Sequence, residues 1–351
     1  MLFLCIIIIF VLAAEGIVRF RQHMKYGAAN VFEDLYYVDP QSGLRLLIPN
    51  TEQKNIKINS HGFRSPEINL TKPDSLIRTV FLGASTTFCA EVSGNDETWP
   101  YLVNKKLEDK FPQARFDFIN AAVPGYTVQS SLKLLTNKVK NFEPDMIIIY
   151  HANNDLAANT RHLAINQGLI SSEPINKTSW LAKHSLLWYL IEFNFQIWKK
   201  QRNSLSNIKQ LDIKSARNEK YISMKFENEL LNLVNECKNV SKEVAIVTFS
   251  YRVRREQVLD EQLEAAKCAF FYMPYLNLED LLYGYEKYNM IIKKVAQKTS
   301  VSLIEGEMEI PGDNIHFADF IHFTDEGCRL MANRVSNGLF YSEKFKRLIQ
   351  K

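Results

Sequence analysis

The stretch from Arg78 to Phe88 constrains the fold of this chain more strongly than its other segments do. A short apolar run, Val80 to Leu82, ends at Gly83 and is followed by a turn of small residues that contains Ser85. Helix-compatible sequence comes next, so we expect a buried strand, a tight turn and a helix. A hydroxyl there lies at the carboxyl edge of a sheet, beside free N–H groups of the coming helix. Ser85 is therefore a candidate nucleophile, although these residues alone favour a serine that merely caps the helix.

Strands alternate with helical stretches along most of the chain. The third predicted strand is too apolar for an exposed position and is typical of the middle of a parallel sheet. Such alternation indicates an α/β fold, a doubly wound three-layer α/β/α arrangement with a five-stranded parallel sheet, plus an N-terminal extension. The predicted strands are Val80–Leu82, Phe116–Ala121, Asp145–Tyr150, Glu243–Phe249 and Val301–Ile304.

Composition excludes several classes of protein. The 351 residues are enough for one large domain with additions or for two domains. The net charge of +4 comes without a basic stripe, so nucleic acid is not an expected partner. The five cysteines form no CxxC pair, and no phosphate-binding loop or metal-ligand cluster occurs. We therefore expect no cofactor, no metal and no disulfide framework.

Residues 1–20 are predicted to form an uncleaved membrane anchor or a signal-like segment. Met1 to Ala14 is almost wholly apolar, and after Glu15 the apolar run continues to Arg19. That length can just span a bilayer, with the rest of the chain periplasmic or extracellular. The basic residues that follow it would by themselves place the C-terminal side in the cytoplasm. A buried N-terminal helix is the alternative.

Two further regions depart from the alternating pattern. Residues 31–77 are predicted to be an extension of short strands and turns, in which Asn59–Arg64 makes a tight turn with Phe63 tucked inward. The main domain would then span 78–351 and carry a helical insertion at about 156–220. Within that insertion, Trp180–Trp198 is rich in large apolar residues. It is either a lid or a membrane-surface helix, or a helix packed on the core.

Four segments are expected to meet at one edge of the predicted sheet. Strand ends bring Ser85, Gly125 and Asn154 to this edge, and a late segment adds Asp319 and His322. The carboxyl ends of parallel strands form the ligand crevice of such sheets. A serine hydroxyl needs a neighbouring base, which His322 can supply, and Asp319 can orient that imidazole. These residue types favour nucleophilic catalysis.

These segments resemble the SGNH (GDSL-type) hydrolase superfamily, and the resemblance covers about Arg78 to the C-terminus. It implies that Ser85 is the nucleophile, His322 the base and Asp319 its partner. The oxyanion hole would be formed by the N–H groups of Ser85 and Gly125 and the amide of Asn154. The chain departs from the family pattern at Ala84, where aspartate is usual, and at Ala152, where glycine is usual. The matching stretches are Phe81–Thr87, Asn120–Gly125, Asn153–Asp155 and Asp319–Gly327.

A second pair has the same spacing as the candidate pair. Asp313 precedes His316 by three residues, as Asp319 precedes His322. We prefer the second pair because Thr324 is expected to cap a helix with acidic residues in its first turn. For His316 we expect a surface or supporting role.

The resemblance implies a serine esterase that hydrolyses O-acyl esters, above all O-acetyl esters, of a cell-envelope glycan or lipid. The Asn59–Arg64 stretch resembles the segment that precedes the hydrolase domain in membrane-anchored bacterial members. An O-acyltransferase that uses the same residues is the nearest alternative, and an inactive glycan-binding envelope protein is a more distant one. The sequence leaves the oligomeric state open.

Overall fold

The computed structural model describes residues 2–26, 35–53, 55–170, 179–204, 211–214 and 216–350. Its centre is a parallel sheet with the strand order β6–β5–β7–β8–β9. The order reverses between β5 and β7, which places a ligand crevice beyond the carboxyl ends of these two strands. The start of the predicted extension at residue 31, and residues 171–178 and 205–210 of the predicted insertion, lie outside the described residues. The strands are β5 (Leu76–Gly83), β6 (Arg115–Asn120), β7 (Met146–Tyr150), β8 (Glu243–Val247) and β9 (Ser302–Ile304).

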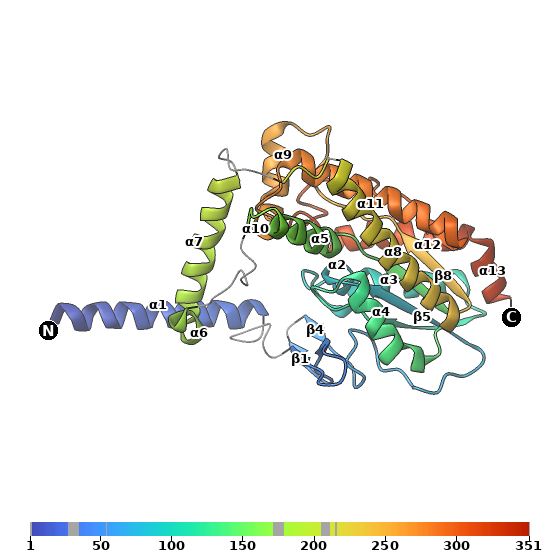
Figure 1. Cartoon of the computed structure of the whole chain (residues 1–351). Helices are drawn as coiled ribbons and strands as arrows, with labels where there is room; N and C mark the ends of the chain where they lie inside the picture. Colours follow the sequence, from blue (N-terminus) through green and yellow to red (C-terminus); the bar gives the residue numbers. More distant parts are fainter. Residues whose placement is uncertain are drawn as a thin grey trace.

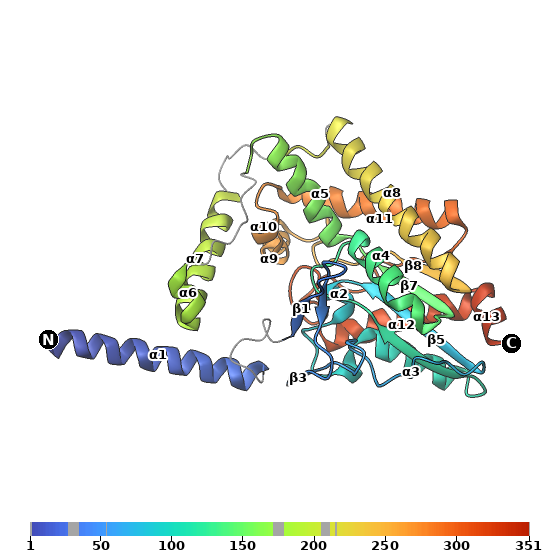
Figure 2. The ribbon, with the colours of Figure 1, turned by 60° about the horizontal axis from the view of Figure 1, so that its bottom comes forward.

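Helices cover both faces of this sheet (Figures 1 and 2). On one face α3 packs against α12 and β6, and on the other face α8 lies among α4, α5 and α11. All residues of β7 are buried, as expected for a central strand covered on both sides. The predicted doubly wound α/β fold is confirmed. The helices of these layers are α3 (Trp99–Lys110), α4 (Val128–Asn137), α5 (Asn153–Asn166), α8 (Ala216–Val240), α11 (Leu278–Thr299), α12 (Asp325–Tyr341) and α13 (Glu343–Ile349).

Threonine caps fix the starts of the two helices that pack together beside the site. The Thr98 side chain accepts a hydrogen bond from the Tyr101 N–H at the start of α3. Thr324 does the same for the Gly327 N–H at the start of α12. The Thr324 cap was expected from the sequence, and both caps satisfy an N–H group that the helix itself leaves free. The remaining short helices are α2 (Ser85–Phe88), η1 (Asn95–Glu97), η2 (Val139–Phe142), α9 (Leu259–Ala266) and α10 (Ala269–Tyr272).

The N-terminal extension consists of two small antiparallel hairpins. Strand β1 (Tyr36–Val38) pairs with β2 (Arg45–Leu47), and β3 (Glu52–Gln53) pairs with β4 (Ile56–Lys57). In the turn that follows, the Asn59 side chain accepts hydrogen bonds from the N–H groups of His61 and Phe63. The Phe63 ring is buried and meets the Phe142 ring edge-on, with the two ring centroids 5.4 Å apart. The His61 ring meets the same Phe142 ring edge-on at 5.1 Å. The predicted tight turn with Phe63 inward is confirmed.

The predicted membrane anchor is wrong. Within the described parts of the chain, no helix combines the length and the apolar character that crossing a membrane requires. The apolar run does form a helix, α1 (Leu2–Tyr26), but Glu15 and Arg19 on it make an ion pair at 2.6 Å. The periplasmic or extracellular location that rested on the anchor loses its basis.

Glu15 also has protein partners that the sequence did not reveal. Its carboxylate accepts hydrogen bonds at the start of α7 (Leu186–Ser204), which lies beside α1 in Figures 1 and 2. Burial alone would raise the pKa of Glu15, but these hydrogen bonds outweigh it and lower the pKa to about 2. An ionised side chain thus joins two helices. The donors are Leu187 N (2.9 Å), Ser185 Oγ (2.8 Å) and Leu186 N (2.9 Å).

Helix α7 and the short α6 (Trp180–His184) stand apart from the main core. No residue of either helix belongs to the buried cluster formed by the described residues, so the expectation of a helix packed on the core is wrong. The contact of α7 with the main domain runs through α10, where the rings of Phe193 and Phe271 meet at 5.1 Å. Several large side chains of α6 and α7 are exposed, among them Trp180, Trp188, Phe195 and Trp198.

Candidate active site

The segments expected at the carboxyl edge of the sheet do meet there. Ser85 begins α2 directly after β5, and Asn154 lies in the first turn of α5 after β7. Gly125 lies in the loop between β6 and α4. Asp319 and His322 lie in the segment that leads into α12. The site therefore occupies the topological switch point of the sheet.

The turn at Ser85 is tight because its neighbours leave no room for larger residues. A Cβ on Gly83 would lie 2.1 Å from Thr87 Oγ1 and 3.1 Å from the Tyr150 carbonyl oxygen. Ala84 occupies the N-cap position of α2 and makes no side-chain cap. The helix-cap role considered for Ser85 is therefore wrong, and its hydroxyl is available for other contacts.

A chain of hydrogen bonds links Ser85 to Asp319. His322 Nε2 lies 2.8 Å from Ser85 Oγ, and His322 Nδ1 lies 2.7 Å from Asp319 Oδ2. The other oxygen of Asp319 accepts the N–H groups of Ile321 and His322, both at 2.9 Å. The carboxylate is thus held by the backbone of its own turn and fixes the imidazole ring. In this arrangement Nδ1–H donates to Asp319, and Nε2 can accept the Ser85 proton.

Electrostatics around His322 favour the charged imidazolium. Burial alone would lower the pKa of His322, but the negative charges of Glu91 and Asp319 and the hydrogen bond to Asp319 raise it to about 9. For Asp319, burial alone would raise the pKa, and the hydrogen bonds and positive charge of His322 lower it below its usual value. The histidine is a strong base held between carboxylates.

The loop that carries Gly125 is bound to the Asn154 side chain. Gly125 has a φ of +86°, a left-handed conformation that favours glycine. The Asn154 amide donates to the Tyr126 carbonyl at 2.9 Å, which ties it to the Gly125 loop. Asn153 donates to Asn154 Oδ1 at 3.4 Å and itself accepts from the Tyr285 hydroxyl at 2.7 Å. An amide nitrogen carries two N–H groups, and the bond to Tyr126 uses one of those of Asn154.

The two departures from the family pattern leave this geometry intact. Ala152 has a φ of −169° and Ala84 a φ of −116°. Neither position lies in the left-handed region that favours glycine. The Ala152 carbonyl accepts the Leu156 N–H at 2.9 Å and so begins α5 in the ordinary way.

The family of the chain follows from the sequence between β5 and α12. The family model of the GDSL-like Lipase/Acylhydrolase family matches residues 81–330, a range that contains the five candidate residues. The chain belongs to this family. It is accordingly a carboxylic ester hydrolase, and the resemblance to SGNH (GDSL-type) hydrolases is confirmed. The finer assignment to membrane-anchored bacterial members has no support from this match.

Solved structures of similar fold include two hydrolases. An acetylxylan esterase from Geobacillus stearothermophilus has 15% identity and a TM-score of 0.45, over 76% of this chain and 95% of that chain. An α/β hydrolase enzyme from the metagenome of Lake Arreo, Spain, has 15% identity and a TM-score of 0.44, over 77% and 96%. No curated protein matches this acylhydrolase by sequence.

The second Asp–His pair of this acylhydrolase forms a similar local turn without the serine. His316 Nδ1 lies 2.8 Å from Asp313 Oδ1, and Asp313 also accepts the His316 N–H at 3.0 Å. Among the described residues, no serine hydroxyl is hydrogen-bonded to the His316 ring. The His316 carbonyl instead accepts the Thr324 N–H at 3.1 Å, at the start of α12. His316 thus supports the turn that carries His322, as expected.

A buried histidine shapes the Asn154 loop from behind. His151 is buried and its Nε2 lies 2.8 Å from Ser131 Oγ. Burial lowers its pKa to about 3, so the ring is neutral. Asp155 accepts the Val128 N–H at 2.9 Å and joins α5 to the start of α4. Burial raises the pKa of Asp155 to about 8. His151 and Asp155 thus support the loop and helix that carry Asn154.

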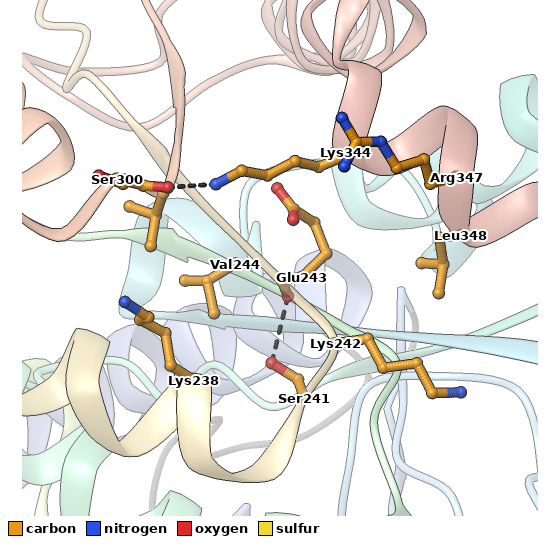
Figure 3. Close-up of a pocket in the computed structure, with 10 residues that line it drawn as sticks. Lys238, Ser241, Lys242, Glu243, Val244, Ser300, Lys344, Arg347 and Leu348 are labelled. Carbon is orange, nitrogen blue, oxygen red and sulfur yellow. Dashed lines mark hydrogen bonds between the residues drawn. The ribbon is translucent and has the colours of Figure 1, made fainter.

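Two cavities lie at opposite ends of the strands and differ in size and in the residues that line them. One of about 10 Å³ is lined by Ser85, Asn154, Tyr150, Phe249 and Ile321, among others, and holds about one water-sized group. One of about 310 Å³ lies at the amino ends of β8 and β9 (Figure 3). Two of its lysines donate to backbone carbonyls, Lys238 to Thr299 and Lys344 to Ser300, and Lys242 pairs with the Asp145 carboxylate. Because it lies at the amino ends of the strands, this second cavity is remote from the candidate residues.

Sequence reasoning missed three contributors to the site. Arg45 from β2 donates to the Pro124 carbonyl beside Gly125, and Arg64 donates to the carbonyls of Phe88 and Cys89 after α2. Glu91 approaches His322 from the loop that follows. Arg45 and Arg64 reach the site through contacts between segments far apart in the chain. Glu91 reaches it through such a contact with His322 and through the left-handed backbone angle of Cys89. The turn predicted at Asn59–Arg64 was the available signal, because it ends on Arg64.

Proposed function

We propose that this acylhydrolase is a serine esterase that removes small O-acyl groups, acetyl above all, from a glycan or lipid through an acyl-enzyme at Ser85. The observation that carries the proposal is the unbroken chain of hydrogen bonds from Ser85 through His322 to Asp319. In this proposal Gly125, Asn154 and the Ser85 N–H form the oxyanion hole. The preference for acetyl is supported by the cavity of about 10 Å³ that Ser85 lines, which favours the smallest acyl group.

The proposed reaction has two halves. As Ser85 Oγ bonds to the ester carbon, its proton passes to His322 Nε2, and the carbonyl electron pair moves onto the oxygen. When the C–O bond to the alcohol breaks, that alcohol takes the proton back. A water molecule then repeats the sequence on the acyl-serine and releases the acid. Removal of one oxyanion donor costs about 10²–10³-fold in rate in hydrolases of this mechanism.

The test uses the full chain and p-nitrophenyl esters of increasing acyl length. We expect hydrolysis of the acetate, a steep decline for longer acyl chains, and loss of activity in Ser85→Ala. Ser93→Ala is the matched control, because Ser93 is exposed and uses its backbone N–H to bind Asp325. Full activity in Ser85→Ala would refute the proposed nucleophile. Equal rates for long and short acyl chains would refute the acetyl preference alone.

A further inference from the structure

Glu91 lies beside the imidazole that Asp319 already holds. Its Oε1 is 3.9 Å from His322 Nδ1, the same nitrogen that lies 2.7 Å from Asp319 Oδ2. The Glu91 side chain is 30% exposed. Within the described residues, its carboxylate makes no ion pair with a lysine or arginine. One imidazole edge thus faces two carboxylates from two different segments.

The loop that carries Glu91 is held from both sides by the N-terminal extension. Asn55 Nδ2 donates to the carbonyls of Ala90 at 3.1 Å and Val92 at 2.8 Å, the residues on either side of Glu91. The buried Arg64 guanidinium donates to Phe88 O at 2.9 Å and to Cys89 O at 2.6 Å. Hydrogen bonds to four of the five carbonyl groups from residue 88 to residue 92 therefore fix the course of this loop.

A backbone angle completes this arrangement. Cys89 has a φ of +61°, a left-handed conformation that is uncommon outside glycine. It turns the chain sharply after α2 and sends the next residues back toward His322. The position of Glu91 is therefore fixed by the left-handed backbone of Cys89 and by the side chains of Asn55 and Arg64.

The charges around this pair come from several segments. Asp319 lies on the His322 turn, Cys89 and Glu91 follow α2, and Arg64 comes from the extension. Tyr36 and Tyr272 also lie within range of the Glu91 charge. Burial raises the pKa of Glu91, the positive charge of His322 opposes that rise, and Asp319 reinforces it. Glu91 is thus most strongly stabilised as an anion when His322 carries its proton.

We propose that Glu91 is a positioning residue that acts through His322, as a second carboxylate that stabilises the imidazolium formed when Ser85 attacks. This inference rests on the proposed function, because it needs His322 to accept the Ser85 proton. It adds no bond and no proton to the reaction: the proton still moves from Ser85 Oγ to His322 Nε2 and then to the leaving alcohol. Glu91 makes the charged state of the imidazole easier to form and sets the pH range of the enzyme.

The test is the pH profile of kcat/KM for p-nitrophenyl acetate with Glu91→Gln. Loss of an opposite charge within about 4–6 Å lowers a histidine pKa by about one unit or more. We therefore expect the acidic limb of the profile to move down by about one pH unit. The plateau at high pH should fall by only about threefold, less than the tenfold gain that a one-unit shift gives on the acidic limb, because the transition state loses a stabilising charge. The two profiles should cross, and a merely structural defect lowers all rates without moving the limb.

Two controls make this test specific. Glu97→Gln removes a carboxylate from the same region, where Glu97 pairs with Arg329 at 3.0 Å, and should leave the profile in place. Glu91→Asp retains the charge and should keep the wild-type position of the limb. It also serves as the conservative variant if glutamine disturbs the loop. Superimposable profiles for wild type and Glu91→Gln would overturn the inference.

Failure of this inference is distinct from failure of the proposed function. If Ser85→Ala is inactive and the Glu91→Gln profile does not move, Glu91 has no role while the esterase mechanism stands. If Ser85→Ala retains activity, the mechanism itself fails and the role of Glu91 fails with it. A combined Asp319→Asn, Glu91→Gln variant provides a second check. The fold-loss of kcat/KM in the double variant should differ from the product of the two single-variant losses, because both carboxylates act on one imidazole.

Discussion

The turns at Asp313–His316 and Asp319–His322 have the same spacing and nearly the same local geometry. In each, the aspartate accepts the backbone N–H of the histidine, at 3.0 and 2.9 Å, and lies 2.8 or 2.7 Å from its Nδ1. They differ in what lies beyond the ring. His322 reaches Ser85 across 237 positions of sequence, whereas the His316 carbonyl supports the start of α12. Spacing builds the turn, and tertiary position decides its chemistry.

The largest effect should separate the two histidines. His322→Ala removes the base for Ser85 and should lower kcat/KM by at least about 10⁴-fold. Among the described contacts His316 makes no hydrogen bond to Ser85, so His316→Ala should retain activity within about threefold. Steady-state hydrolysis of p-nitrophenyl acetate by both variants provides the comparison. Equal losses would mean that the two turns do not differ as described.

Substitution of Asp319 should lower kcat far more than substitution of Asp313. Asp319→Asn leaves the geometry but removes the charge that orients His322, and we expect a loss of about 10²–10⁴-fold in kcat. The loss should lie toward the lower end, because Glu91 still faces His322 at 3.9 Å. Asp313→Asn should change kcat by less than about threefold. A large loss in Asp313→Asn would show that the first turn takes part in the chemistry.

Alanine substitutions of two glycines in α12 test how closely this helix packs against the Asp313–His316 turn. A Cβ on Gly327 would lie 2.0 Å from the His316 carbonyl oxygen, which is backbone and cannot move alone. Gly327→Ala should therefore cost about 1–3 kcal/mol of unfolding free energy or more, and lower activity by displacing His322. In Gly338→Ala the new Cβ meets the Ile304 side chain at 2.9 Å, which can shift. Denaturant unfolding should show the smaller loss there.

The smallest effect concerns pH. The pKa of His322 is raised from 6.5 to about 9, so its stabilising contribution is complete below about pH 6.5 and is lost as pH rises through 9. Activity should move in the opposite direction, because the base must first lose its proton. Asp155, whose pKa is raised to about 8, also titrates in this range. The difference in unfolding free energy between wild type and His322→Gln, measured from pH 6 to 10, isolates the contribution of His322.

The sequence was most informative where function lies at strand ends. Ser85, Gly125 and Asn154 follow buried strands whose apolar runs are visible in the sequence, so their common edge could be predicted from the parallel sheet. The capped start of α12 likewise distinguished His322 from His316. These features depend on local sequence and on a topology with few alternatives.

What could not be predicted depends on partners far apart in the chain. Glu15 looked like an interruption of an apolar span because its partners at the start of α7 come about 170 positions later. The approach of Glu91 to His322 depends on the left-handed Cys89 and on carbonyl contacts from Asn55 and Arg64. No periodicity or spacing reports such contacts. They become visible only when the segments are placed in space.

The most direct test of the account is to identify the acyl-enzyme. The full chain is mixed with p-nitrophenyl acetate, quenched in acid within the first turnovers, digested and analysed by mass spectrometry. The account predicts a burst of p-nitrophenol and an acetyl group on the peptide that contains Ser85, with both absent in His322→Ala. Turnover without a burst and without acetylated Ser85, or unchanged acetylation in His322→Ala, would contradict it.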